Sequence, residues 1–166
     1  MFDRAIPGGD SRVLELLQKI QDIPELFGFS KVTLLRGNHE QLLIDAIEKG
    51  SQSSAYDLWV YNGGDLTFYK EAGAHLDWLK SLPHYYIKDD FLFVHAGITP
   101  GVSLEEQRES DMLWIREPFL NCEDHGLPYC VIHGHSPVDT VDIKEHRINI
   151  DTGAYYSGNL SALILQ

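Results

Sequence analysis

The expected fold depends on three stretches of sequence: VTLLRGNHE (residues 32–40), FLFVHAG (91–97) and YCVIHGHS (129–136). Each is a short apolar run typical of a β-strand, and each ends in a glycine-containing turn that carries a histidine or an asparagine. In open α/β sheets, ligands bind beyond the carboxyl ends of the strands, where the loops converge. We therefore expect these turns to contribute to one shared site.

The turns place polar side chains at that edge of the sheet, namely Asn38, His39, His95 and His135. An amide oxygen combined with imidazoles suits manganese, iron or zinc, and because this set is neutral it needs carboxylates to complete it. Each turn also has a purely structural explanation. Asn38 can cap a helix, and a histidine at a strand end is often a core residue. Three such endings in one chain favour a metal site.

The rest of the chain alternates helical and strand patterns. Helices are expected over residues 12–21, 39–49 and 103–115, with shorter helical pieces from Ser54 to Ser81. Strands are expected over residues 31–35, 84–88 and 91–95. Further strands are expected in the runs YCVIHG, TVDIKE, HRINID and LSALIL of the last third. This order indicates a mixed α/β fold.

Length and composition indicate one globular domain spanning residues 1–166, with one core. Thirteen Lys and Arg against twenty-five Asp and Glu give a formal net charge of −12, which repels nucleic acid and anionic membranes. Cys122 and Cys130 are too few for a disulfide framework, and no apolar run approaches the roughly 20 residues of a membrane span. We therefore expect a cytoplasmic protein without nucleic-acid or membrane partners.

Longer motifs add a resemblance to a known family. RGNHE, FLFVHAGITP, MLWIREPFL, VIHGHSPV and INIDTGAYYSGNLSALIL resemble, in order and spacing, the bacterial serine/threonine phosphoprotein phosphatases, a branch of the calcineurin-like metallophosphoesterases. The resemblance runs from Asp3 to the end of the chain. It implies a mixed β-sandwich flanked by helices and an enzyme that hydrolyses phosphoserine and phosphothreonine. The expected partner is a phosphoprotein or phosphopeptide substrate.

The resemblance also implies a role for each residue of the site. Asn38, His95 and His135 would ligate one metal of a two-metal centre, with manganese expected and iron or zinc as alternatives. His39 would be the catalytic histidine that protonates the leaving oxygen, and Asp3 would orient it. The implied reaction is an in-line attack on phosphorus by a water activated by the two metals.

Two arginines, Arg4 and Arg116, resemble those that bind the substrate phosphate in the family, because a planar guanidinium suits a tetrahedral anion. Arg36, beside the GNH motif, is expected to be an exposed salt-bridge partner and is left outside the site. His133, two residues before His135, is expected to pack behind the site.

The front of the chain departs from the family pattern. Family members have an Asp-x-His-Gly loop and a Gly-Asp pair ahead of the Asp-Arg that is Asp3-Arg4 here. By that alignment the chain lacks the ligands of the other metal and the bridging carboxylate. We therefore expect the N-terminally truncated, carboxyl-terminal part of a phosphatase domain, which binds at most one ion weakly and whose activity is impaired.

Two alternative functions stay open. Dinucleoside polyphosphate hydrolases share GNHE and HAGI and differ mainly in the pockets around the metals, but the WIREPFL and DTGAYYSGNLSAL stretches favour the protein phosphatase branch. The second alternative is a catalytically dead remnant that acts as a binding module, which the missing carboxylates favour.

Overall fold

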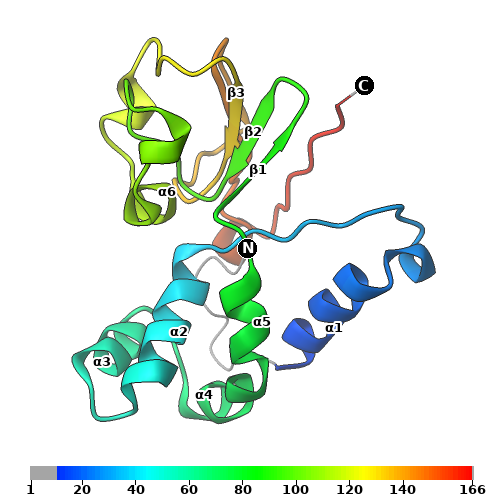
Figure 1. Cartoon of the computed structure of the whole chain (residues 1–166), viewed down its shortest axis with the longest axis vertical. Coiled ribbons are helices and arrows are strands. Elements are labelled where there is room, and N and C mark those ends of the chain that lie inside the picture. The colour runs from blue at the N-terminus through cyan, green and yellow to red at the C-terminus, as the bar shows by residue number, and fades with distance from the viewer. Residues whose placement is uncertain (1–10, 166) are drawn as a thin grey trace. The chain divides into compact units, whose positions relative to one another are not determined.

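The computed structural model describes residues 11–165 of the chain (Figure 1). Contacts divide these residues into two compact units, one running to Pro83 and the other starting at His84. Each unit has its own cluster of buried hydrophobic side chains. The length and composition of the chain predict a single core instead. The two units are therefore described in turn.

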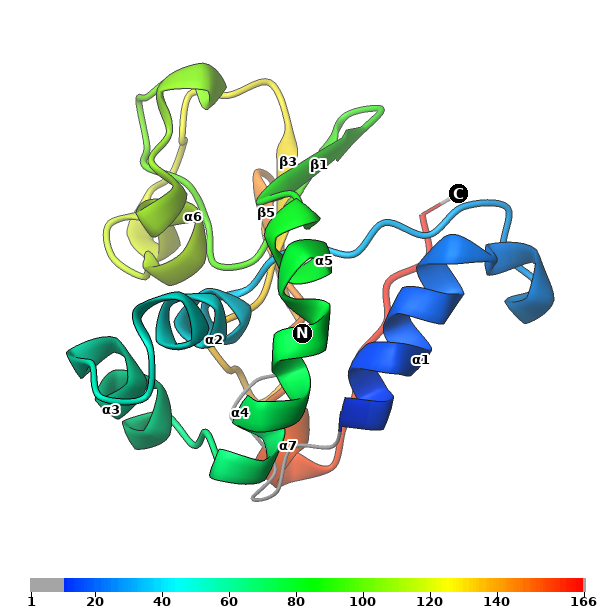
Figure 2. The same cartoon turned by 60° about the horizontal axis from the view of Figure 1, so that its bottom comes forward.

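The first unit is helical, and its helices are labelled in Figure 2. In chain order the elements are α1 (Ser11–Asp22), a 3-10 turn (Pro24–Phe27), α2 (Asn38–Lys49), α3 (Ser54–Tyr61), α4 (Leu66–Ala72), a 3-10 turn (Gly73–His75) and α5 (Leu76–Ser81). The helices expected over residues 12–21 and 39–49 are confirmed. Helix α2 packs against α3 and α5 around a core that includes Leu43, Trp59 and Leu79.

Side-chain caps explain where several of these helices begin. Ser53 Oγ accepts a hydrogen bond from the Tyr56 N–H at the start of α3, and Asp65 Oδ1 accepts two at the start of α4. Ahead of α2, the Glu40 carboxylate accepts a hydrogen bond of 2.7 Å from the Gly37 N–H. Each cap satisfies a backbone donor that the helix itself leaves unpaired. The cap at Gly37 fixes the chain immediately before two of the predicted site residues.

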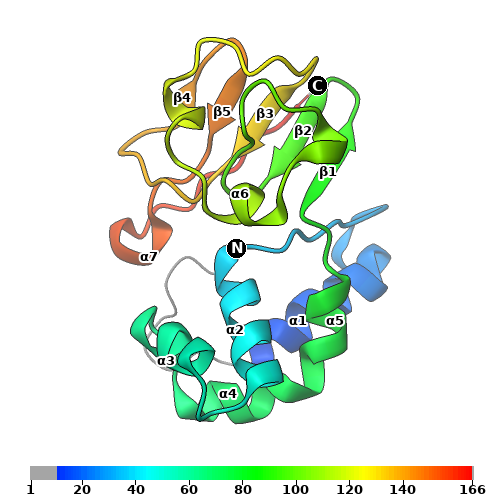
Figure 3. The ribbon, with the colours of Figure 1, turned by 60° about the vertical axis from the view of Figure 1, so that its left-hand side comes forward.

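The second unit contains a five-stranded mixed sheet, seen face-on in Figure 3. Its strands are β1 (Tyr85–Lys88), β2 (Phe91–Val94), β3 (Cys130–His133), β4 (Asp142–Ile143) and β5 (Arg147–Asn149), in the order β1-β2-β3-β5-β4. Strands β2, β3 and β5 run parallel, with Phe93 opposite Ile132 and Ile132 opposite Ile148. The outer strands β1 and β4 are antiparallel to their neighbours. The predicted α/β class with a mixed sheet is confirmed.

The long connection from β2 to β3 lies over one face of this sheet (Figure 3). It contains a 3-10 turn (Leu104–Glu106), α6 (Glu109–Trp114) and a second 3-10 turn (Phe119–Asn121), and a short helix α7 (Ala154–Ser157) follows β5. The continuous helix expected over residues 103–115 is wrong. Gln107 and Arg108 have extended backbones that interrupt it, because the Gln107 side chain bonds to a remote loop.

Two expected strands are also wrong. Residues 31–35 and 160–165 have strand-like apolar patterns, yet neither belongs to a strand in the described part of the chain. A strand forms only where a second strand completes its backbone hydrogen bonds, and a local pattern says nothing about that second strand. The strands expected over residues 84–88 and 91–95 do form, because they pair with each other.

Replacing Gly97 by Ala is expected to lower the free energy of unfolding by about 1–3 kcal/mol, the usual cost of overpacking a core. A Cβ at Gly97, where φ is +155°, would lie 2.2 Å from Cδ1 of the fully buried Phe119. Urea denaturation measures the loss, which should shrink in a Phe119→Leu background. Gly73→Ala is the control, because no neighbouring atom lies within 4 Å of a Cβ there. An unchanged free energy of unfolding in Gly97→Ala would contradict this packing.

Candidate active site

His95 and His135 lie together at the carboxyl ends of two neighbouring parallel strands. His95 directly follows β2, and His135 comes two residues after β3. The Nε2 atom of His95 is 3.1 Å from Nδ1 of His135, and both side chains are buried, with exposed fractions of 4% and 5%. The Gly134 N–H donates a hydrogen bond of 2.9 Å to the His95 carbonyl, which joins the two turns. Two converging imidazole nitrogens suit a shared divalent ion.

The His135 turn is held in an unusual backbone conformation. His135 has a φ of +65°, which is uncommon for a residue other than glycine. The Ser136 N–H donates to the Gly134 carbonyl at 2.8 Å, and the side chain of Asn149 donates to the Ser136 carbonyl at 2.7 Å. Asn149 is only 1% exposed. The sequence analysis did not predict its role, for which the only signal was a polar residue within the strand-like run HRINID. Its hydrogen bond fixes the turn that presents the His135 ring.

Asp151, just beyond β5, is a second residue that the sequence analysis missed. Its Oδ1 accepts a hydrogen bond of 2.9 Å from the Gly153 N–H, and its own N–H donates to Asn149 Oδ1 at 3.0 Å. Its Oδ2 is buried and has no hydrogen-bond partner among the described residues. A buried carboxylate oxygen is costly to leave unpaired, so this oxygen is a place where a donor or cation would be stabilised.

Arg116 reaches the His135 turn from the segment after α6. Its Nη1 donates a hydrogen bond of 2.8 Å to the hydroxyl of Ser136, while the residue as a whole is exposed. The ring of Trp114 stands edge-on to the His135 ring, with centroids 5.8 Å apart and an interplanar angle of 85°. An anchored, solvent-facing guanidinium beside a histidine pair is a suitable donor for phosphate oxygens.

Asn38 and His39 are the first two residues of α2 in the helical unit. Gly37 is the N-cap, so the alternative that Asn38 is a helix cap is wrong. Asn38 is 3% exposed, and its Oδ1 is buried without a hydrogen-bond partner in the described part of the chain. A buried amide oxygen without a donor is costly, which fits its predicted role as a metal ligand. His39 is half-buried on the same helical turn.

Arg36 is not the exposed salt-bridge partner that the sequence predicts. It is half-buried, and its guanidinium donates to Gln41 Oε1 at 3.1 Å and to the carbonyl of Lys80. Its backbone N–H donates to the Pro83 carbonyl at 2.9 Å. Arg36 therefore fastens the start of α2 to the end of α5, and it does so through carbonyl and amide oxygens.

His133 packs behind the His135 turn, as expected. It is 2% exposed, its Nδ1 lies 3.1 Å from the Gly134 carbonyl, and its Nε2 lies 3.4 Å from Nη1 of Arg147. Arg147 in turn pairs with Asp142 at 2.9 Å. Burial lowers the pKa of His133 to about 4, and the nearby charge of Arg147 acts in the same direction. The hydrogen bond to the Gly134 carbonyl raises the pKa and offsets only part of this effect. The imidazole is therefore neutral near pH 7.

The low pKa of His133 predicts an acid-sensitive stability. Because the folded-state pKa is depressed, the unfolded chain binds a proton between pH 6.5 and about 4 that the folded chain does not. The free energy of unfolding is expected to fall by about 2 to 3 kcal/mol over that range and to lose no more from this residue below it. Urea denaturation of metal-free protein at several pH values measures it. His133→Asn should flatten the profile, and an equally steep profile in that variant would contradict the assignment.

The structure brings together part of the predicted site. His95, His135 and Arg116 lie side by side in the second unit, and Asn38 and His39 lie in the first. Asp3 and Arg4 fall outside the described residues. Among residues 11–165, no group of three His, Cys, Asp or Glu side chains is arranged to hold a metal ion. Within the second unit, the fit to a metal therefore depends on the histidine pair, and within the first unit the buried Asn38 oxygen is a separate candidate ligand. Within residues 11–165, no helix has the length and apolarity to cross a membrane.

Comparisons with known proteins agree on a family. The profile of the calcineurin-like phosphoesterases matches residues 2–163. The chain is 31% identical over 158 residues to serine/threonine-protein phosphatase 2 of Escherichia coli (strain K12), covering 84% of this chain and 70% of that protein. It is 30% identical over 158 residues to serine/threonine-protein phosphatase 1 of Salmonella typhimurium, covering 82% and 68%.

A solved structure shares the fold. It is a crystal structure assigned as a diadenosine tetraphosphatase, with a TM-score of 0.54 and 19% sequence identity. The match covers 83% of this chain and 64% of the solved one, so this chain spans less than two thirds of that structure.

Proposed function

Since the chain belongs to the calcineurin-like phosphoesterases, a family of phosphoester hydrolases, we propose that it hydrolyses phosphoserine and phosphothreonine in proteins. One observation carries the proposal, namely the cluster at the ends of β2 and β3. There His95 and His135 lie 3.1 Å apart, and Arg116 bonds to the residue that follows His135. Metal-ligating nitrogens next to an arginine are the groups that phosphoester hydrolysis uses.

Asn38, His95 and His135 are the residues that would hold a divalent ion, with manganese proposed and iron or zinc as alternatives. When bound there, the ion would supply positive charge to the phosphoryl oxygens on which negative charge develops. His39 donates a proton to the leaving oxygen, a task that suits an imidazole near neutral pH. Asp3 is proposed to orient His39.

Arg116 is proposed to bind the substrate phosphate together with Arg4. One guanidinium nitrogen of Arg116 is fixed by Ser136, and the group is exposed, so its other N–H groups can donate to phosphate oxygens. The hydrogen bond to Ser136 matters because a guanidinium that is already held in place loses less side-chain entropy when it binds phosphate than a mobile one does. Ser136 therefore acts as the support for this arginine.

Charge favours a protein substrate over a polyphosphate. The segment between β2 and β3 that carries Arg116 exposes six acidic side chains, Glu105, Glu106, Glu109, Glu117, Glu123 and Asp124, and its exposed basic residues are Arg108 and Arg116. Such a surface attracts basic residues beside a phosphoserine and repels a dinucleoside polyphosphate with its several negative charges. The two curated relatives, both named serine/threonine-protein phosphatases, support the same choice.

A second candidate is a dinucleoside polyphosphate hydrolase, which the assignment of the solved structure favours. A third is a binding module without catalysis. For the proposed enzyme, the partner is a phosphoprotein, and the net charge of −12 supports neither nucleic acid nor an anionic membrane as a partner. The cytoplasmic location stays a prediction.

A parallel assay separates these candidates. The manganese-loaded chain is given a phosphoserine peptide with basic flanking residues, the same peptide with acidic flanks, and diadenosine tetraphosphate. We expect the basic peptide to be hydrolysed fastest, and His135→Ala, purified identically, serves as the control for contaminating host phosphatase. Faster hydrolysis of the dinucleotide would support the second candidate. Peptide binding with no hydrolysis above the His135→Ala control would support the third.

A further inference from the structure

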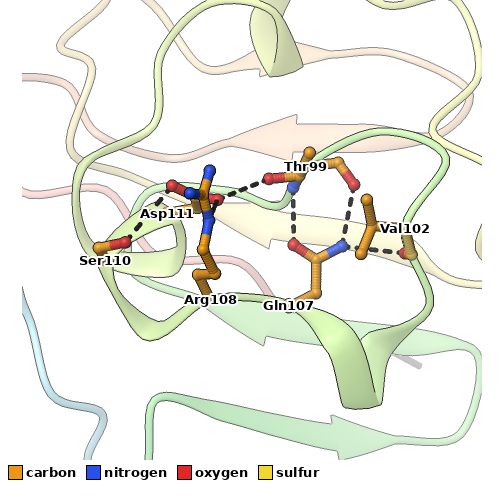
Figure 4. Close-up of polar contacts among 6 residues, drawn as sticks. All are labelled: Thr99, Val102, Gln107, Arg108, Ser110 and Asp111. Atoms are coloured by element: carbon orange, nitrogen blue, oxygen red, sulfur yellow. Dashed lines mark hydrogen bonds and ion pairs between the residues drawn. The ribbon is translucent and has the colours of Figure 1, made fainter.

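The loop that follows His95 is bonded to the approach to α6 through one side-chain amide, that of Gln107 (Figure 4). Gln107 Oε1 accepts a hydrogen bond of 2.7 Å from the Thr99 N–H. Its Nε2 donates to the carbonyl of Thr99 at 2.9 Å and to the carbonyl of Val102 at 3.0 Å. The side chain is 9% exposed and uses both amide protons. Gln107 therefore pairs with the Thr99 backbone as a neighbouring strand would.

A second set of bonds reinforces this connection. The Thr99 hydroxyl donates to Asp111 Oδ2 at 2.9 Å, and Arg108 Nε donates to the same oxygen at 3.0 Å (Figure 4). The Ala96 N–H, next to His95, donates to the Met112 carbonyl at 2.9 Å. The His95 loop and α6 are thus joined at successive points along both segments.

Helix α6 needs this support because it is short. It spans Glu109–Trp114 and has no side-chain cap at its N-terminus. A helix of this length is not stable by itself in water. Trp114 and Arg116, the two residues that reach the His135 turn, lie at its last position and just beyond it. Their placement therefore depends on what holds the start of α6.

We propose that Gln107 is a positioning residue of the site, which acts with Thr99 and Asp111 to hold Trp114 against His135 and Arg116 against Ser136. Its part in phosphate binding rests on the proposed function, whereas its part in placing Trp114 does not. The polar atoms of Gln107 lock the 99–102 loop onto the segment before α6, and α6 transmits that geometry to the two site residues. Loss of the amide frees the segment of residues 107–116, which contains α6, without removing any group that touches phosphate.

The first test measures the position of the Trp114 ring relative to His135 and does not depend on activity. The edge-on Trp114 ring shifts the NMR signals of the His135 ring protons, which are assigned with a His135→Ala sample. Gln107→Met keeps the volume but loses the three hydrogen bonds. We expect it to move the His135 signals toward those of Trp114→Leu, with no further change in the double variant. Unchanged His135 signals in folded Gln107→Met would overturn the proposal, because a merely stabilising role lowers stability without moving them.

A milder pair of variants keeps the proposal testable if Gln107→Met does not fold. Thr99→Val removes the hydroxyl that bonds to Asp111, whereas Thr99→Ser keeps it. The His135 signals should move in Thr99→Val and stay in place in Thr99→Ser. Identical signals in the two variants would count against the proposal.

The second test measures inorganic phosphate binding to the manganese-loaded protein by calorimetry. Gln107→Met is expected to weaken binding about tenfold, a fraction of what charged hydrogen bonds contribute. In an Arg116→Ala background the same change should have no further effect, and an additive loss would overturn the link through Arg116. If Arg116→Ala alone binds phosphate as the unsubstituted protein does, the proposed function fails at this arginine. The placement of Trp114 by Gln107 is then decided by the NMR test alone.

Discussion

Replacing His39 by Asn is expected to lower the turnover of a phosphoserine peptide by about 10²- to 10⁴-fold, the usual contribution of a general acid. The serine alkoxide is a poor leaving group, so its departure needs a proton from a nearby acid. His39 sits half-buried on the first turn of α2, next to the buried Asn38. Asn keeps a polar side chain at that position but cannot deliver a proton.

The loss should depend on the leaving group. An aryl phosphate such as p-nitrophenyl phosphate releases a stabilised phenolate that needs no proton, so His39→Asn should lose much less activity with it. Turnover of both substrates by the same metal-loaded preparation measures the difference. Equal losses for the two substrates would show that His39 is not the acid.

The neighbouring residue provides the matched control. Asn38 is the predicted ligand, with a buried Oδ1 that has no hydrogen-bond partner in the described residues. Asn38→Ala is therefore expected to lose bound metal and activity together, whereas His39→Asn should retain its metal. Calorimetry with Mn²⁺, with free ion present throughout, distinguishes the two. Loss of metal in His39→Asn would place that histidine among the ligands instead.

Replacing His95 by Ala is expected to weaken Mn²⁺ binding more than about 100-fold, because removing even an outer-shell partner of a ligand costs 10- to 100-fold. The unsubstituted chain itself is expected to bind at most one ion, and weakly. The predicted ligands are two imidazoles and an amide, all neutral, so no ligand charge offsets the charge of the ion. Calorimetry with Mn²⁺ gives both the affinity and the number of ions.

His75→Gln is the control for this measurement. His75 lies in the helical unit, outside the motifs, and its Nδ1 is 3.1 Å from Gln18 Oε1. Its replacement should leave Mn²⁺ binding unchanged. Two tight sites per unsubstituted chain, or His95→Ala binding Mn²⁺ as well as His75→Gln does, would contradict the assigned ligands.

The sequence pattern correctly predicted the helices and strands that are stabilised by residues close to them in the chain. The helices at α1 and α2 and the adjacent strands β1 and β2 were all predicted within a residue or two. The strand expected over residues 31–35 failed, because pairing depends on a partner that its own residues do not specify. The helix expected over residues 103–115 failed at Gln107, whose amide bonds to Thr99, eight residues earlier.

The candidate site shows the same division. His95, His135 and Arg116 were identified from motifs, and the structure places them together. Apart from His133, the residues that hold the candidate site residues in place were not identified, because their role appears only in three dimensions. Asn149 acts through the Ser136 carbonyl in the turn after β3, and in the helical unit Arg36 holds the start of α2, which carries Asn38, through the carbonyls of Lys80 and Pro83. No spacing rule in the sequence connects such pairs.

The strand order β1-β2-β3-β5-β4 also has a consequence for the folding pathway. Strands β1 and β2 are joined by the two-residue turn Asp89-Asp90 and can pair early through local contacts. Strand β3 joins β2 only after the connection of residues 95–129 has closed, and loop closure of that length has an entropic cost that slows folding. His95 is the first residue of this connection and His135 lies two residues beyond β3, so the two become neighbours late. A nascent chain that has not yet completed this step therefore does not present the two imidazoles side by side.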